Sequence, residues 1–83
     1  MRRIKGLYNS GLEVDEDAHI LDGTMINGNL HVRGGARVIV DGMVGGTLIA
    51  DDSDVVLNGM AQRVETRGKG KIDGPGMRGQ VMK

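Results

Sequence analysis

The chain has 83 residues, enough for one domain over residues 1–83, with fifteen glycines, a single aromatic residue, no cysteine and equal numbers of acidic and basic side chains. The lack of cysteine excludes disulfides and thiolate metal sites, and the zero net charge excludes a whole-molecule field that attracts nucleic acid. The first twenty residues hold no continuous apolar run and no stretch reaches 18 apolar residues, so neither a signal peptide nor a membrane helix is expected.

Short β-like segments follow one another along the chain, separated by turns that contain glycine. In order they include residues 12–14, 30–32, 37–40 and 54–57. Their β-branched residues and two-residue alternation predict strands, and Asp or Asn before Gly predicts turns. Helices are not expected, because no window keeps apolar residues at helical spacing without an interior glycine, which costs about 1 kcal/mol in a helix.

Two sequence markers recur from one end of the chain to the other. The first is an aliphatic residue, a polar residue and a glycine, and it begins at Ile4, Leu21, Val40, Leu57 and Ile72. The second is an aliphatic pair separated by one residue, and its members are Leu12-x-Val14, Leu30-x-Val32, Leu48-x-Ala50 and Val64-x-Thr66, with an echo at Val81. The spacings predict four to five stacked coils of 15 to 19 residues each.

A finer six-residue beat predicts three sides per coil. It consists of Val14, Ile20, Ile26, Val32, Val38, Val44, Ala50 and Val56. The sequence therefore predicts an all-β, single-domain parallel β-helix, a three-sided solenoid whose coils lie about 4.8 Å apart. Its predicted interior is Leu12, Val14, Ile20, Ile26, Leu30, Val32, Val38, Val40, Val44, Leu48, Val55, Leu57, Val64 and Ile72.

The glycine punctuation in the middle of the chain resembles that of a known family. Residues 42–50, Gly-Met-Val-Gly-Gly-Thr-Leu-Ile-Ala, are similar to the repeat of the bactofilins, and residues 54–59 continue the same style. The resemblance covers about residues 4–74. It implies a right-handed triangular β-helix, as in these bacterial cytoskeletal proteins, which associates end to end into filaments without nucleotide.

The ends of a coil stack predict self-association, because an exposed strand edge templates further pairing and no capping helix is expected at either end. The predicted association surface is Ile4, Leu7, Tyr8, Met77, Val81 and Met82. Residues 13–22 hold five acidic and no basic side chains, whereas residues 63–83 are mainly basic. This segregation favours head-to-tail over head-to-head contact.

Other polar clusters are expected to lie on the solvated surface, so no catalytic residue, metal site or cofactor is predicted. His19 and His31 lack the third ligand of a catalytic zinc site, and residues 51–54 lack the EF-hand pattern for calcium. Arg67, Lys69 and Lys71 form at most a weak patch for anions or a partner, because they match no phosphate-binding motif and no aromatic residue accompanies them.

These features predict a non-enzymatic, bactofilin-like structural protein of the cytoplasm whose main partner is itself. Another protein partner is an open alternative, nucleic acid is not expected, and the cations of residues 1–5 allow only weak contact with the inner face of a membrane, at about 1 kcal/mol each. The alternatives are a small binding module, such as an immunity-type partner or phage fibre segment, and a fragment of a left-handed hexapeptide-repeat acyltransferase.

Overall fold

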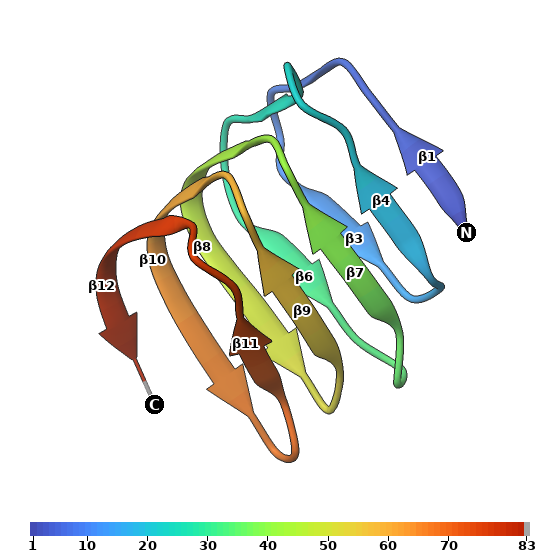
Figure 1. Cartoon of the computed structure of the whole chain (residues 1–83), viewed down its shortest axis with the longest axis vertical. Coiled ribbons are helices and arrows are strands. Elements are labelled where there is room, and N and C mark those ends of the chain that lie inside the picture. Colours follow the sequence, from blue (N-terminus) through green and yellow to red (C-terminus); the bar gives the residue numbers. More distant parts are fainter. Residues whose placement is uncertain (83) are drawn as a thin grey trace.

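The computed structural model describes residues 1–82, without the side chain of Met82, and these residues wind into a parallel β-solenoid (Figure 1). Every strand pairing is parallel and joins strands of successive coils. The chain makes about five coils and contains no helix over the described residues, so the predicted all-β solenoid is confirmed. Accordingly, none of its elements is a helix long and apolar enough to cross a membrane.

The strands line three faces of the solenoid. The first face consists of β1 (Arg2–Ile4), β4 (Ala18–Ile20), β7 (Arg37–Val40), β9 (Asp54–Leu57) and β11 (Lys71–Asp73). The second face consists of β2 (Leu7–Tyr8), β5 (Met25–Ile26) and the first residues of β8 (Met43–Asp51), β10 (Met60–Arg67) and β12 (Met77–Met82). The third face consists of β3 (Leu12–Val14), β6 (Leu30–Val32) and the later residues of β8, β10 and β12.

Strands β8 and β10 each cover two faces because each continues through the bend between those faces. The start of β8 pairs with β5 and its end pairs with β6, with Gly45 and Gly46 between the two parts. At Gly46 a Cβ would meet the carbonyl oxygen of Gly28 at 2.5 Å, so the bend needs glycine there. In β10 the register shifts between Ala61 and Arg63, which marks the same corner one coil later.

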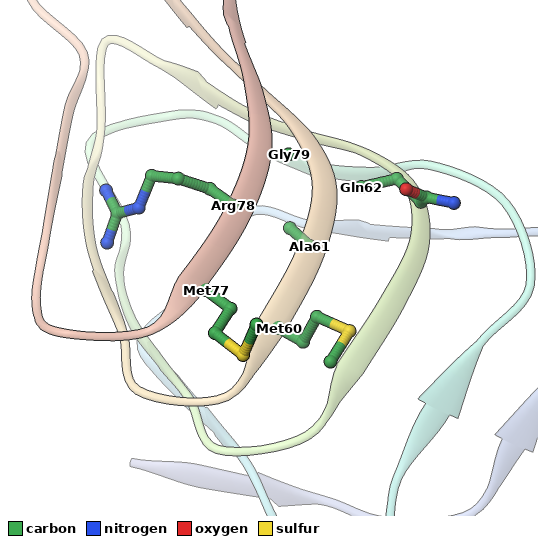
Figure 2. A pocket seen from close by; sticks show the side chains of 6 residues that line it. All are labelled: Met60, Ala61, Gln62, Met77, Arg78 and Gly79. Atoms are coloured by element: carbon green, nitrogen blue, oxygen red, sulfur yellow. The ribbon is translucent and has the colours of Figure 1, made fainter.

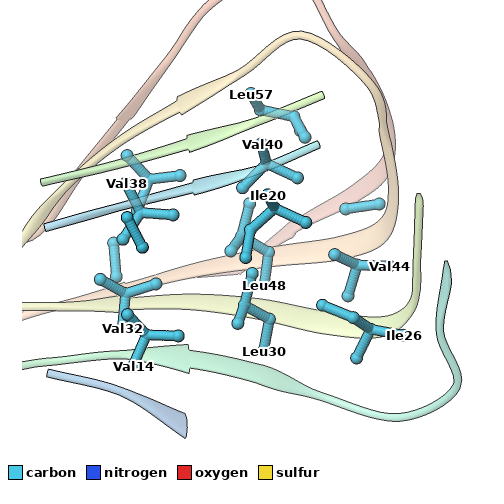
Figure 3. Packing of buried hydrophobic residues seen from close by; sticks show 14 of the residues in the cluster. Val14, Ile20, Ile26, Leu30, Val32, Val38, Val40, Val44, Leu48 and Leu57 are labelled. Atoms are coloured by element: carbon cyan, nitrogen blue, oxygen red, sulfur yellow. The ribbon is translucent and has the colours of Figure 1, made fainter. Parts of the chain in front are cut away.

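The second sequence marker stacks in register through the whole solenoid. One column contains Leu12, Leu30, Leu48, Val64 and Val81, each paired with the next. The neighbouring column contains Val14, Val32, Ala50 and Thr66. Figure 3 shows members of both columns in the interior, with Leu30 beside Leu48 and Val14 beside Val32. Each such aliphatic side chain contributes about 1.5–3 kcal/mol on burial.

The first marker and the six-residue beat hold only in part. Ile4, Ile20, Val40 and Leu57 share one column, so Leu21 lies one residue out of phase. Ile72 pairs with Val55 instead of Leu57. The beat already fails at Val56, which is 39% exposed and points outward while Val55 is buried.

The coil length varies as widely as the markers suggested, but the individual coil lengths differ from the marker spacings, which explains this drift. Arg2 pairs with Ala18, sixteen residues on, whereas Ala18 pairs with Val38, twenty residues on, one more than the predicted maximum. The longest coil contains the turn at Gly34 and Gly35, both with positive φ (71° and 76°). A turn of two left-handed glycines adds residues at a corner without disturbing the strands on either side.

The predicted interior residues are buried except Leu12 and Ile72, which are half-buried and pack against the core. Both belong to terminal coils, which have a neighbour on one side only. The structure adds small residues that the sequence reading left out, among them Ala18, Ala36, Ala61 and Thr24. The hydroxyl of Thr24 donates to the carbonyl oxygen of Ile4 at 3.2 Å, so this buried polar group is satisfied.

Replacing Gly70 with alanine is expected to lower the free energy of unfolding by about 3 kcal/mol, as for severe overpacking. The new Cβ would overlap the carbonyl oxygen of Ala50 on the neighbouring coil. Neither atom can move away without shifting the backbone that carries it. Gly45→Ala is the matched control, since its Cβ would meet the carbonyl oxygen of Ile26 at 3.3 Å and is expected to cost about 0.5 kcal/mol. Urea unfolding followed by circular dichroism measures the free energy of unfolding of both variants. Equal losses of stability would contradict the close approach of Gly70 to the backbone of Ala50.

Candidate association surfaces

A column of exposed apolar side chains runs along the outside of the second face. We name it the methionine ladder, and its members are Leu7, Met25, Met43, Met60 and Met77. Their exposed fractions range from 39% to 68%. They point outward because strand residues alternate and the next column, with Ile26, Val44 and Ala61, is buried. In-register pairing therefore places five apolar side chains in one line.

The neighbouring outward column is uncharged and partly without side chains. It contains Asn9, Asn27, Gly45, Gln62 and Gly79. The side-chain amide of Asn27 donates to Asn9 Oδ1 at 3.0 Å. Two shallow hollows of about 210 and 220 Å³ lie between this column and the ladder, beside Gly45 and beside Gly79.

Figure 2 shows the second hollow with Met60 and Met77 on one side and Gln62 on the other. Arg78 also lines it, but its guanidinium is turned away from the methionines. This guanidinium donates to the carbonyl oxygens of Gly74 at 2.6 Å and Gly76 at 3.3 Å. The other residues that line this hollow are apolar or uncharged.

The two terminal coils form a second candidate surface. Among the described residues, β1, β2 and β3 pair only with the second coil, and β11 and β12 pair only with the fourth. Each terminal coil thus presents one strand edge whose backbone groups have no strand partner. The core column that is buried at Leu30 and Leu48 ends at Val81, which is 64% exposed.

The association residues expected from the sequence fall into three groups. Leu7 and Met77 are exposed, but both belong to the methionine ladder instead of to separate end surfaces. Tyr8 is half-buried and Val81 is exposed at the ends of interior columns. Ile4 was wrongly placed on this surface, because it is only 3% exposed beneath the first face, and the Met82 side chain lies outside the described residues.

The charges are layered by coil instead of divided between the two ends. At the corner between the third and first faces, residues 15–17 are acidic, 33–37 basic, 51–54 acidic and 67–71 basic. In the strand register, Arg37 lies opposite Asp54, and Asp54 lies opposite Lys71. The first coil also carries the basic residues of positions 2–5. The simple acidic-to-basic gradient expected along the axis is therefore replaced by alternating layers.

The basic segment around Arg67 lies against this acidic layer. Arg67 forms an ion pair with Glu65, and the backbone N–H of Lys69 donates to Asp52 Oδ1 at 2.7 Å. Asp52 adopts a positive φ of 48°, which brings its carboxylate under the next turn. Arg67, Lys69 and Lys71 are all exposed, but their charge is partly balanced by the acidic residues below them. The same corner buries Ser53, whose hydroxyl donates to the carbonyl oxygen of Asp51 at 2.8 Å.

Both histidines contact carboxylates on neighbouring coils, which the sequence reading did not foresee. His19 Nε2 donates to Asp41 Oδ2 at 2.5 Å, and His31 Nε2 donates to Asp51 Oδ2 at 3.1 Å. Their side chains are about 30% exposed, so they are half-buried instead of freely solvated. Over residues 1–82 the structure gathers no group of three or more potential metal ligands.

The hydrogen bond from His19, with a second from Asn58, holds the pKa of Asp41 below its usual value of 3.8. The signal that could have found this pair is the register of the first face, in which His19 lies over Ile39 and therefore near Asp41.

No family model matches the chain, and no curated protein or solved structure does.

Replacing Asp41 with asparagine is expected to flatten the acid side of the stability–pH curve. A depressed carboxyl pKa stabilises the fold above pH 3.8, and this contribution is lost as the pH falls through the folded-state pKa. The variant should be less stable than the wild type at pH 6, by about 0.5 kcal/mol for such a half-buried pair, and equal to it near pH 2.

Thermal unfolding between pH 2 and 7 measures this difference. Asp22→Asn is the matched control, since Asp22 is exposed and has no hydrogen-bond partner among the described residues. A difference between Asp41→Asn and the wild type that does not change with pH would rule out the His19–Asp41 pair as its source.

Proposed function

We propose that this protein is a non-enzymatic structural protein that assembles through the ends of its solenoid into oligomers or filaments. The observation that carries the proposal is the strand edge without a strand partner at each end of the solenoid. The interior columns of side chains end at these edges, where a further coil could extend them. A parallel edge of this kind accepts another parallel strand with the same side-chain spacing. The resemblance of residues 42–50 to the bactofilin repeat supports the same function.

The observed register specifies how a second copy would continue the stack head to tail. Successive partners in one outward column are Arg3, His19, Ile39, Val56 and Asp73. A copy added in this register would therefore set its Arg3 against Asp73 of the copy below. The core column would continue in the same way, with Leu12 placed over Val81.

These contacts favour a polar stack over a head-to-head one. Arg3 and Asp73 carry opposite charges, both are exposed, and neither forms an ion pair with another described residue. A head-to-head contact would bring Arg3 towards the basic residues in the first coil of the other copy, and like-charge repulsion disfavours this contact. The absence of cysteine suits a reducing cytoplasm, where we propose that the assembly works.

A small binding module on the same scaffold is the second candidate function. The uncharged methionine ladder favours it, because methionine is enriched and charge is depleted in protein interfaces. We rank a hexapeptide-repeat acyltransferase fragment lower, since coil steps of 16 to 20 residues depart from a strict multiple of six.

Reversing one charge of the proposed end contact is expected to dissociate the assembly. Arg3→Asp or Asp73→Arg alone should weaken association at least tenfold, and the chain that carries both changes should recover it, because the pair is then restored in opposite order. Size-exclusion light scattering and negative-stain electron microscopy at physiological salt measure the assembly.

Ile39→Glu is the control for this experiment, since it adds a charge in the middle of the same outward column, two rungs away from both Arg3 and Asp73. It should leave the end contact intact. A wild-type chain that stays monomeric at about 100 μM, well above the Kd of a standard interface, would refute the proposed function.

A further inference from the structure

We propose that the methionine ladder is a second interface, on which two copies of this chain pack face to face. This contact joins the sides of two solenoids, so it is separate from the end-to-end contact proposed above. The ladder extends over all five rungs, from Leu7 on β2 to Met77 on β12. Each of its members has at least 39% of its surface exposed, whereas Ile26, Val44 and Ala61 in the column beside it are buried.

The second face differs from the other two in charge. Neither of its outward columns contains an acidic or basic residue, although the chain has eleven of each sign. The first face carries the His19–Asp41 pair, and the third carries the ion pair of Glu13 with Arg33, at 2.7 Å. An uncharged, methionine-rich strip matches an equally uncharged partner, because a charged partner would lose hydration without gaining an ion pair.

The face also combines protruding side chains with shallow hollows. Met43 and Met60 protrude, while the missing side chains of Gly45 and Gly79 leave the two hollows of about 210 and 220 Å³ beside them. Two copies related by a two-fold axis through the middle of the face would set the ladder of one against the uncharged strip of the other, the isologous arrangement of most dimers. Methionine is flexible enough to fill such shallow hollows.

The size of the face fits a dimer contact. The accessible surface of 4733 Å² is shared between three faces and two ends, so one face can supply roughly the 800 Å² per partner of a standard interface. A second copy is favoured over a lipid surface, since peripheral membrane contacts combine apolar groups with lysine or arginine and this face has none in its two outward columns.

The first test measures the mass of the Arg3→Asp chain, in which end-to-end contact is expected to be at least tenfold weaker. At about 100 μM this chain is expected to be a dimer by light scattering. Adding Met43→Glu and Met60→Glu should weaken the dimer at least tenfold, because two charges would be buried without partners. The matched control is Val56→Glu, since Val56 and Met60 are both 39% exposed but lie on different faces.

The second test uses the lack of cysteine in the natural chain. Met43 lies on the middle rung, so a two-fold axis through the face brings it close to its copy. In the Arg3→Asp background, Met43→Cys should oxidise to a disulfide-linked dimer at least tenfold faster than Val56→Cys. Circular dichroism of each variant establishes that the solenoid is folded.

The outcomes separate this inference from the proposed function. A monomeric Arg3→Asp chain, equal oxidation rates for the two cysteine variants, or binding to phosphatidylcholine vesicles in place of dimer formation would each overturn the lateral interface. End-to-end stacking would then be judged separately by the Arg3–Asp73 charge reversal. Conversely, a wild-type chain that stops at a dimer and loses it with Met43→Glu and Met60→Glu supports the lateral interface alone.

Discussion

The structure depends on one constraint: side chains of the same kind lie above one another, coil after coil, along a common axis. Leu30 pairs with Leu48 and Val32 with Ala50 because the parallel backbone ladder fixes the register of each coil on the last. A single coil cannot bury its inner face, so the core exists only where neighbours cover it. The half-buried state of Leu12 and Ile72 in the terminal coils is the direct consequence.

The same register organises the outside of the solenoid. When the same residue type recurs at an outward position in successive coils, its side chains form a continuous line along the solenoid. The methionine ladder of the second face is such a line. At the corner between the third and first faces the recurrence alternates in sign, so acidic and basic turns follow one another along the stack. Contacts such as Lys69 N–H to Asp52 then bind neighbouring coils together at the corners, where the strands contribute no pairing.

The end-to-end and lateral contacts proposed for this protein differ in physical origin. The ends offer backbone edges and interrupted core columns, so a partner there extends the existing ladder. The second face offers side-chain surface only, and a partner there adds apolar contact without changing the ladder. A solenoid that uses both would form paired stacks, which suits a structural role for an otherwise small domain.

The sequence by itself determined the solenoid, its three faces, the column from Leu12 to Val81 and nearly all of the interior, because apolar alternation and corner glycines are local properties. Only the tertiary structure decided which coils are longer, since the turn at Gly34 and Gly35 shifts the register without changing the strand pattern. That register in turn set the His19–Asp41 pair, the outward position of Val56 and the alignment of the methionines. Contacts between coils depend on the summed lengths of three turns and strands, and an error of one residue exchanges the inner and outer faces.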